Sequence, residues 1–224
     1  MSIFDASIEK REGEGERYLA PYHLSHRFGY AGHPSTITQL REIRILNKPL
    51  PDTVADATLI PYQKPQPHDM RPDMVILDAI GRGDPRLWVP LSEHVAVRPL
   101  QFNVTLGQYT HVMRVTKAGM IARHRHSGAV HAWVFKGRWH YLEHDWVAEE
   151  GSYIFEPPGE THTLVVPEGC SEMITFFQVN GSLMYVDPQG ISTGYDDVFT
   201  RIDKARAHYT SVGLGERYVE QFIR

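Results

Sequence analysis

Histidines are concentrated in the middle of the chain. Six of the thirteen lie between His124 and His162, and the stretch "RHRHSGAVH" at 123–131 holds three of them. Side chains alternate faces along a β-strand, so His124 and His126 should point the same way while Arg125 points away. His162 follows the turn sequence "EPPGE" and opens the apolar run "HTLVV", so we expect it on a neighbouring strand.

Three imidazoles placed in this way can bind a metal ion. Imidazole is a common ligand for iron, zinc, copper and nickel, and three on converging strands would occupy one face of the ion. Histidines inside a barrel without a metal would each need a hydrogen-bond partner. We therefore predict that His124, His126 and His162 are metal ligands. For His140 and His144 an ordinary polar position is the better interpretation.

The charge of this ligand set indicates a class of chemistry. Three neutral histidines leave the full double positive charge on the ion, unlike a site that includes a carboxylate. Such an ion favours a bidentate anionic oxygen ligand, for example the enediolate of a hydroxyketone or the enolate of a diketone, because chelation neutralises the charge. An electron-rich enolate reacts well with O₂. The expected partners are therefore a small-molecule substrate and O₂.

Other residues near the histidines are candidates for catalysis and substrate binding. Glu143, in "WHYLEHDW", would share a strand face with Trp139 and Tyr141. If that face is inward, burial would raise the pKa of Glu143 toward that of a general base; a surface glutamate is the equal alternative. The candidate pocket residues, each of which has core packing or a solvated position as its alternative, are Trp133, Trp139, Tyr141, Phe155 and Gln178.

The elements that would position these side chains are short strands. From about residue 84, β-rich runs such as "THVMRVT" and "MITFFQV" are separated by Gly and Pro turns, which is typical of an antiparallel sandwich or barrel. We predict an all-β protein with an N-terminal extension (1–83), a β-barrel domain (84–187) and a C-terminal helical tail (188–224). The stretch "YDDVFTRIDKARAHY" (195–209) has helical spacing and acidic residues at its start.

Composition excludes several classes of partner. The formal net charge of the 224 residues is −4, and no basic block stands out, which argues against nucleic acid and anionic membrane surfaces. No run approaches the roughly 18 apolar residues of a membrane span, and the first residues lack the apolar segment of a signal peptide. We expect a cytoplasmic protein. The single cysteine, Cys170, cannot form an internal disulfide.

Two segments resemble the conserved cupin motifs. "GMIARHRHSGAVHAWVFKG" (119–137) resembles the first, and "GSYIFEPPGETHTLVV" (151–166) resembles the second, with Gly151, Gly159 and His162 at the expected spacing. The resemblance implies a jelly-roll β-barrel that holds the metal inside. Because cupins commonly pair, and because the N-terminal arm offers strands for sheet extension, we also expect a homodimer.

The first motif departs from the cupin pattern at one ligand. The glutamate that usually supplies a fourth ligand is missing, and Val130 or His131 stands in its place. The ligand set is therefore all imidazole, unless Glu143 or His131 contributes a fourth ligand. Alternatively, His131 contacts the ligands without binding the metal itself.

A longer resemblance covers Arg123 to Val166. This stretch is similar to the 2,4'-dihydroxyacetophenone dioxygenase family of single-cupin iron enzymes. The group that it resembles next most is the acetylacetone-cleaving dioxygenases. The resemblance implies a non-haem Fe(II) dioxygenase that cleaves a C–C bond of an aromatic α-hydroxyketone to give an aromatic acid and formate. The alternatives are a β-diketone-cleaving dioxygenase, a non-catalytic cupin that holds zinc or nickel and binds a small ligand, and a cupin isomerase or hydrolase.

Overall fold

The structure, a computed structural model, describes residues 61–224. All of its elements lie in one compact unit, Pro67–Arg224. Of the predicted N-terminal extension, residues 1–60 lie outside the described residues. The strands are β1 (Val89–Pro90), β2 (Val95–Asn103), β3 (Gln108–Val115), β4 (Gly119–His126), β5 (Val130–Lys136), β6 (Arg138–Tyr141), β7 (Ala148–Glu149), β8 (Tyr153–Glu156), β9 (Thr161–Val166), β10 (Met173–Asn180), β11 (Leu183–Val186) and β12 (Ser192–Asp196). The helices are the 3₁₀ turn η2 (Pro85–Leu87), α1 (Val198–Ser211) and the 3₁₀ segment η3 (Glu216–Phe222).

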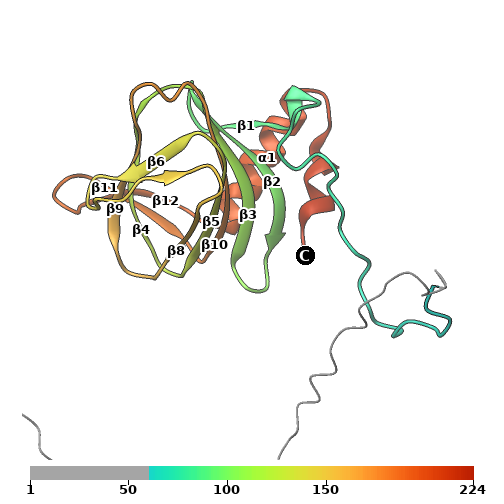
Figure 1. The fold of residues 1–224 in the computed structure, drawn as a ribbon. Helices are drawn as coiled ribbons and strands as arrows, with labels where there is room; N and C mark the ends of the chain where they lie inside the picture. The colour runs from blue at the N-terminus through green and yellow to red at the C-terminus, as the bar shows by residue number, and fades with distance from the viewer. Residues whose placement is uncertain (1–60) are drawn as a thin grey trace, which may run out of the picture. The chain divides into compact units, whose positions relative to one another are not determined.

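The strands form two six-stranded sheets that enclose the interior of a barrel (Figure 1). One sheet has the order β1-β2-β3-β10-β5-β8 and the other the order β12-β11-β4-β9-β6-β7. The paired strands of both sheets run antiparallel. The prediction of an all-β jelly-roll barrel is confirmed.

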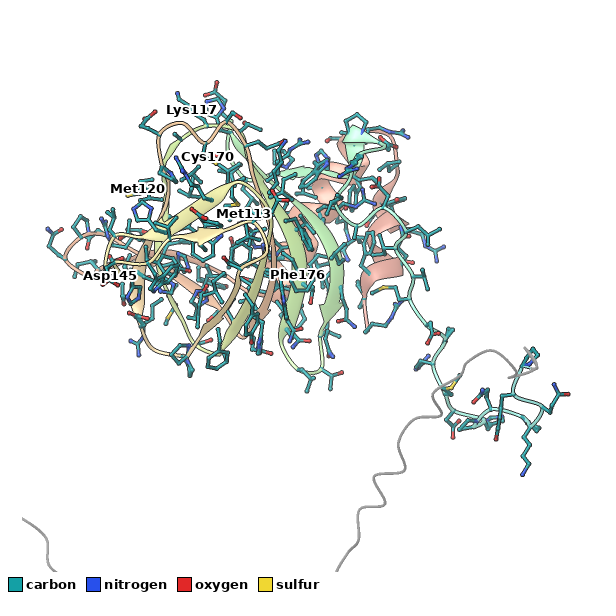
Figure 2. The ribbon with its side chains drawn as sticks, viewed as in Figure 1. Met113, Lys117, Met120, Asp145, Cys170 and Phe176 are labelled. Atoms are coloured by element: carbon teal, nitrogen blue, oxygen red, sulfur yellow. The ribbon has the colours of Figure 1, made fainter. Side chains whose placement is uncertain are left out.

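Strict alternation of side chains builds the core between the sheets. Along β10 every second residue is buried, so Phe177 lies inside the barrel while its neighbour Phe176 lies on the outer face. Figure 2 shows side chains filling the space between the sheets, with Met113 of β3 among them. The metal-ligand candidates stand among these inward side chains.

Glycines make the sharp turns that carry the chain from one sheet to the other. Gly137, between β5 and β6, has a φ of 75°, and a Cβ placed there would lie 2.3 Å from the carbonyl oxygen of Glu172. No larger residue fits without moving the backbone. Gly151 and Gly159, the two glycines of the second motif, also lie in turns and have φ values of 89° and 102°.

Helix α1 packs on the barrel as predicted. Its N-cap Asp197 accepts a hydrogen bond from the Thr200 amide at 2.8 Å, and the Thr200 hydroxyl accepts one from the Asp197 amide at 2.8 Å. The helix contacts β1 and β2 and begins at Val198, later than expected, because β12 runs on to Asp196. Within residues 61–224 no helix is long and apolar enough to cross a membrane.

Candidate metal centre

Three buried histidines meet inside the barrel. His124 and His126 project from one face of β4, and His162 lies directly opposite His124 on the paired strand β9. The Nε2 atoms of His124 and His126 are 3.0 Å apart, and one nitrogen from each of the three rings lies within 4.8 Å of the others. The structure thus brings together the three residues that the strand spacing predicts.

This cluster has the properties of a metal site. Two ligands bound at right angles with bonds of about 2.1 Å lie about 3.0 Å apart, which is the separation of the Nε2 atoms of His124 and His126. Among the described residues, both ring nitrogens of His162 are buried without a hydrogen-bond partner. Unpartnered buried nitrogens are costly, and a cation would use their lone pairs. The donor set therefore fits a transition metal ion.

Burial keeps these histidines in the form that binds metal. Desolvation, together with the neighbouring histidines, holds the pKa of His124 well below its ordinary value. Desolvation lowers the pKa of His162 to about 4, although the charge of Glu156 opposes the shift. Both rings are consequently neutral at physiological pH, as a metal ligand must be.

A carboxylate that the sequence analysis did not identify lies against the histidines. Glu156, at the end of β8, is only 4% exposed, and its Oε2 lies 2.9 Å from Nε2 of His126 and 3.5 Å from Nε2 of His162. These contacts lack hydrogen-bond geometry, so Oε2 is itself a buried acceptor without a donor among the described residues. An oxygen and two nitrogens are thus directed at one small volume, and the site is not composed of imidazole alone.

Tyr141 fixes both Glu156 and His162. Its hydroxyl donates a hydrogen bond of 2.8 Å to Oε1 of Glu156, which leaves Oε2 facing the histidines. Its ring stacks on His162, with centroids 3.7 Å apart and planes inclined by 7°. Burial and the charge of Glu156 raise the pKa of Tyr141, so the hydroxyl stays protonated and remains a donor. Trp139 packs behind Tyr141 in the core, with ring centroids 5.2 Å apart.

The barrel and its histidines correspond to a known family of folds. Residues 78–183 match the family described as the ChrR Cupin-like domain. The barrel has the cupin fold. A comparison with curated proteins gives no match.

Solved structures share this cupin fold. An RmlC-like cupin from Ralstonia eutropha JMP134 is 27% identical over 56% of this chain and 83% of its own, with a TM-score of 0.53. An acetylacetone dioxygenase from Acinetobacter johnsonii is 17% identical over 66% of this chain and 99% of its own, also with a TM-score of 0.53. At that identity the second similarity shows the fold alone.

Glu143 does not face the interior of the cupin barrel, which corrects the general-base interpretation. Strand β6 ends at Tyr141 and the chain turns, so the alternation that would have placed Glu143 beside Tyr141 no longer applies. Its exposed carboxylate accepts hydrogen bonds from the Thr163 amide at 2.7 Å and the Thr163 hydroxyl at 2.9 Å. Although desolvation opposes the shift, these hydrogen bonds lower the pKa of Glu143, which is the opposite of our expectation.

Four further candidates lie on the outer face of the sheet formed by β5, β8 and β10. On β5 the inward residues are Val130, Ala132 and Val134, so His131 and Trp133 point outward. Nδ1 of His131 lies 2.8 Å from the Tyr153 hydroxyl, within an exposed group of aromatic rings. The residues that we correct from pocket or ligand candidates to outer-face positions are His131, Trp133, Phe155 and Gln178. Of the predicted pocket residues, Tyr141 lines the cavity and Trp139 supports it from behind.

A cavity of about 610 Å³ adjoins two of the histidines. His124, His126 and Tyr141 line it, as do Arg201 and Lys204 of α1. The apolar side chains that line it include Leu91, Val95, Met113, Ile121, Leu164, Phe177, Val179, Leu183 and Val186. This volume is in the range of small-molecule sites, so the metal centre has room for a substrate of modest size.

Proposed function

We propose that this cupin is a non-haem Fe(II) dioxygenase that cleaves a C–C bond of a small ketone. The proposed substrate is an aromatic α-hydroxyketone similar to 2,4'-dihydroxyacetophenone, which would give an aromatic acid and formate. A β-diketone is the alternative, because the acetylacetone dioxygenase named above has the same fold. The observation that carries the proposal is the buried cluster of His124, His126 and His162, two of which line a cavity large enough for such a substrate.

The residues around the cluster support an enolisation step. The three histidines would hold Fe(II), which would act as a Lewis acid for the chelated ketone and mediate electron transfer from its enolate to O₂. Oε2 of Glu156 lies beside the cluster, and the hydroxyl of Tyr141 holds the other carboxylate oxygen. Glu156 is therefore placed to take a proton from a hydroxyketone or diketone as its enediolate or enolate forms, a role we first assigned to Glu143.

Metal content and oxygen uptake test the function directly. Protein purified without added metal is analysed for iron, zinc and nickel, and the iron-loaded form is then supplied with hydroxyketones and diketones in an oxygen electrode. We expect one O₂ consumed per substrate cleaved. No uptake with any of these ketones would reject the oxygenase, and a zinc-filled inactive protein that binds them would support a non-catalytic cupin.

Single substitutions test the ligand set. Replacing His124, His126 or His162 with Ala should remove most of the bound metal and the activity together. His131→Ala is the matched control, because this imidazole lies on the outer face of the barrel. A variant of the cluster that keeps full metal occupancy would show that its histidine is not a ligand.

The cellular setting is also part of the proposal. We propose a cytoplasmic homodimer with no nucleic-acid partner, in keeping with the net charge of −4 and the pairing common among cupins. Sedimentation of the full chain at micromolar concentration tests the dimer, and a monomer there would contradict it.

A further inference from the structure

The cavity that adjoins the histidines also carries positive charge from α1. Arg201 and Lys204, both on α1, line the same cavity as His124 and His126. Arg201 is only 7% exposed, so its guanidinium lies in the interior and not in solvent. A buried arginine at a cavity wall requires partners, because a charge removed from water is costly unless it is paired.

One carboxylate is shared between these two cations. Asp196, 1% exposed, contacts Nη2 of Arg201 at 3.0 Å and also contacts the Lys204 ammonium. It further accepts hydrogen bonds from the Tyr185 hydroxyl at 2.7 Å and the Thr200 hydroxyl at 3.1 Å. Its two oxygens are thus fully engaged with four donors. Two positive charges against one negative charge leave this group with a net positive charge.

The guanidinium also has donors without acceptors. Among the described residues, Nε and Nη1 of Arg201 are buried with no hydrogen-bond partner. The hydroxyl of Tyr109, whose ring lies 5.6 Å from the Arg201 guanidinium carbon, is likewise buried and unpartnered. Buried donors of this kind are rare in folded proteins, since most are satisfied by protein or by a bound partner.

We infer that Arg201, assisted by Lys204, binds a carboxylate of the substrate. Nη1 is free to donate a charge-assisted hydrogen bond to one carboxylate oxygen, and the Lys204 ammonium supplies a second positive charge. The inference rests on the proposed function: the ketone would bind at the histidines, and an acidic group would bind at α1. The apolar side chains that line the same cavity, Met113 and Phe177 among them, fit a short hydrocarbon or aromatic spacer. The substrate class is therefore a hydroxyketone or diketone that also carries a carboxylate.

A pair of ligands that differ only in charge tests this inference without turnover. Benzoate and benzamide have nearly the same shape, and their binding to the full-length protein is measured by titration calorimetry, before and after metal is removed with a chelator. We expect benzoate to bind at least about tenfold more tightly in both forms, as charge-assisted hydrogen bonds exceed neutral ones. Equal binding of the two ligands by the metal-free protein would overturn the inference.

Two variants locate the preference on the helix. Arg201→Gln should abolish the preference for benzoate. Arg206→Gln removes the same charge from the same helix, but Arg206 pairs with Asp203 at 2.9 Å and does not line the cavity, so this variant should keep the preference. An unchanged preference in Arg201→Gln would reject the assignment to Arg201.

Two further variants are tested if Arg201→Gln does not fold. Thermal unfolding shows whether that variant folds; if it does not, Arg201→Lys, which keeps the charge but loses Nη1, and Lys204→Met at the half-exposed position are titrated instead. Each should reduce the preference by several-fold, and no reduction in either would contradict the inference. Because the readout needs neither iron nor O₂, an inactive protein would leave this result standing. If the protein cleaves neutral ketones but shows no preference for benzoate, the proposed function stands and the carboxylate site is rejected.

Discussion

Tyr141 lies flat against His162, with ring centroids 3.7 Å apart and planes inclined by 7°. The same tyrosine donates a hydrogen bond to Glu156, so one side chain sets the orientation of an imidazole and of a carboxylate. Such partners behind a metal ligand fix its orientation as strongly as the strand that carries it. The geometry of the centre therefore depends on β6 as well as on the two strands that carry histidines.

Separating the two roles of Tyr141 gives the first prediction. Tyr141→Phe keeps the stacked ring but removes the hydroxyl, so we expect retained metal, reduced turnover and a loss of about 1–3 kcal/mol in the free energy of unfolding, since Glu156 loses its donor. Tyr141→Leu should additionally lower metal occupancy. Urea unfolding and metal analysis measure both effects. Identical metal content in the two variants would mean that stacking does not position His162.

The role of Glu156 gives the second prediction. Glu156→Gln keeps the shape and the acceptor for Tyr141, so the variant should retain iron while kcat for ketone cleavage falls by about 10²–10⁴-fold through loss of the base. The check is iron content beside steady-state oxygen uptake. Loss of iron would instead make Glu156 a ligand, and full activity would remove it from the mechanism.

Glu143 gives the third prediction, which concerns stability alone. Glu143→Ala leaves the amide and hydroxyl of the buried Thr163 without their acceptor, and we expect a loss of about 1 kcal/mol in unfolding free energy with metal content and kcat unchanged. Glu143→Gln, which keeps an acceptor, is the control and should be closer to the parent protein. A large fall in kcat for either variant would restore Glu143 to the active site.

The fourth prediction concerns pH and His111. Burial lowers the pKa of His111 to about 3, with the charge of Arg201 acting in the same direction. The unfolded chain binds this proton near pH 6.5 and the folded protein does not, so the stability that depends on neutral His111 is complete above about pH 6.5 and is lost as pH falls toward 3. The slope for this one group is at most about 1.4 kcal/mol per pH unit.

Comparing variants isolates that contribution from other titrating groups. His111→Phe removes the proton that the unfolded chain would gain. Between pH 6 and 4 the unfolding free energy of this variant should therefore fall less steeply with falling pH than that of the parent, and the difference in slope should correspond to about one bound proton. Chemical denaturation at several pH values gives the two slopes. Parallel slopes would show that His111 is not held neutral by the fold.

The sequence predicted those parts of the site that depend only on local alternation. His124 and His126 share a face because they are two residues apart on one strand, and that rule needs no knowledge of the fold. Alternation also placed Trp133 and His131 on a common face, but which face meets the interior depends on the pairing of β5 with β8 and β10. That information is not local, and the choice was wrong.

The two carboxylates show where local rules fail. Treating "WHYLEHDW" as one strand put Glu143 on the same face as Trp139 and Tyr141, whereas the strand ends at Tyr141 and the alternation of faces stops there. Alternation puts Glu156 on the face of β8 opposite Tyr153 and Phe155, but the sequence does not show which of the two faces is the inner one. Its contact with His126 depends on the approach of β8 to β4 across the barrel, which sequence spacing does not show.

The packing of aromatic rings behind His162 gives the protein an optical reporter of its own centre. Trp139 and Trp146 lie 5.2 Å and 5.6 Å from the ring of Tyr141, which touches His162, whereas Trp133 lies on the outer face and Trp88 packs under Arg114. A paramagnetic ion such as Cu(II) or Co(II) in the centre would quench the emission of the inner pair by short-range energy transfer, more strongly than that of the other two. Filling of the site can therefore be followed by intrinsic fluorescence, without a label and without substrate.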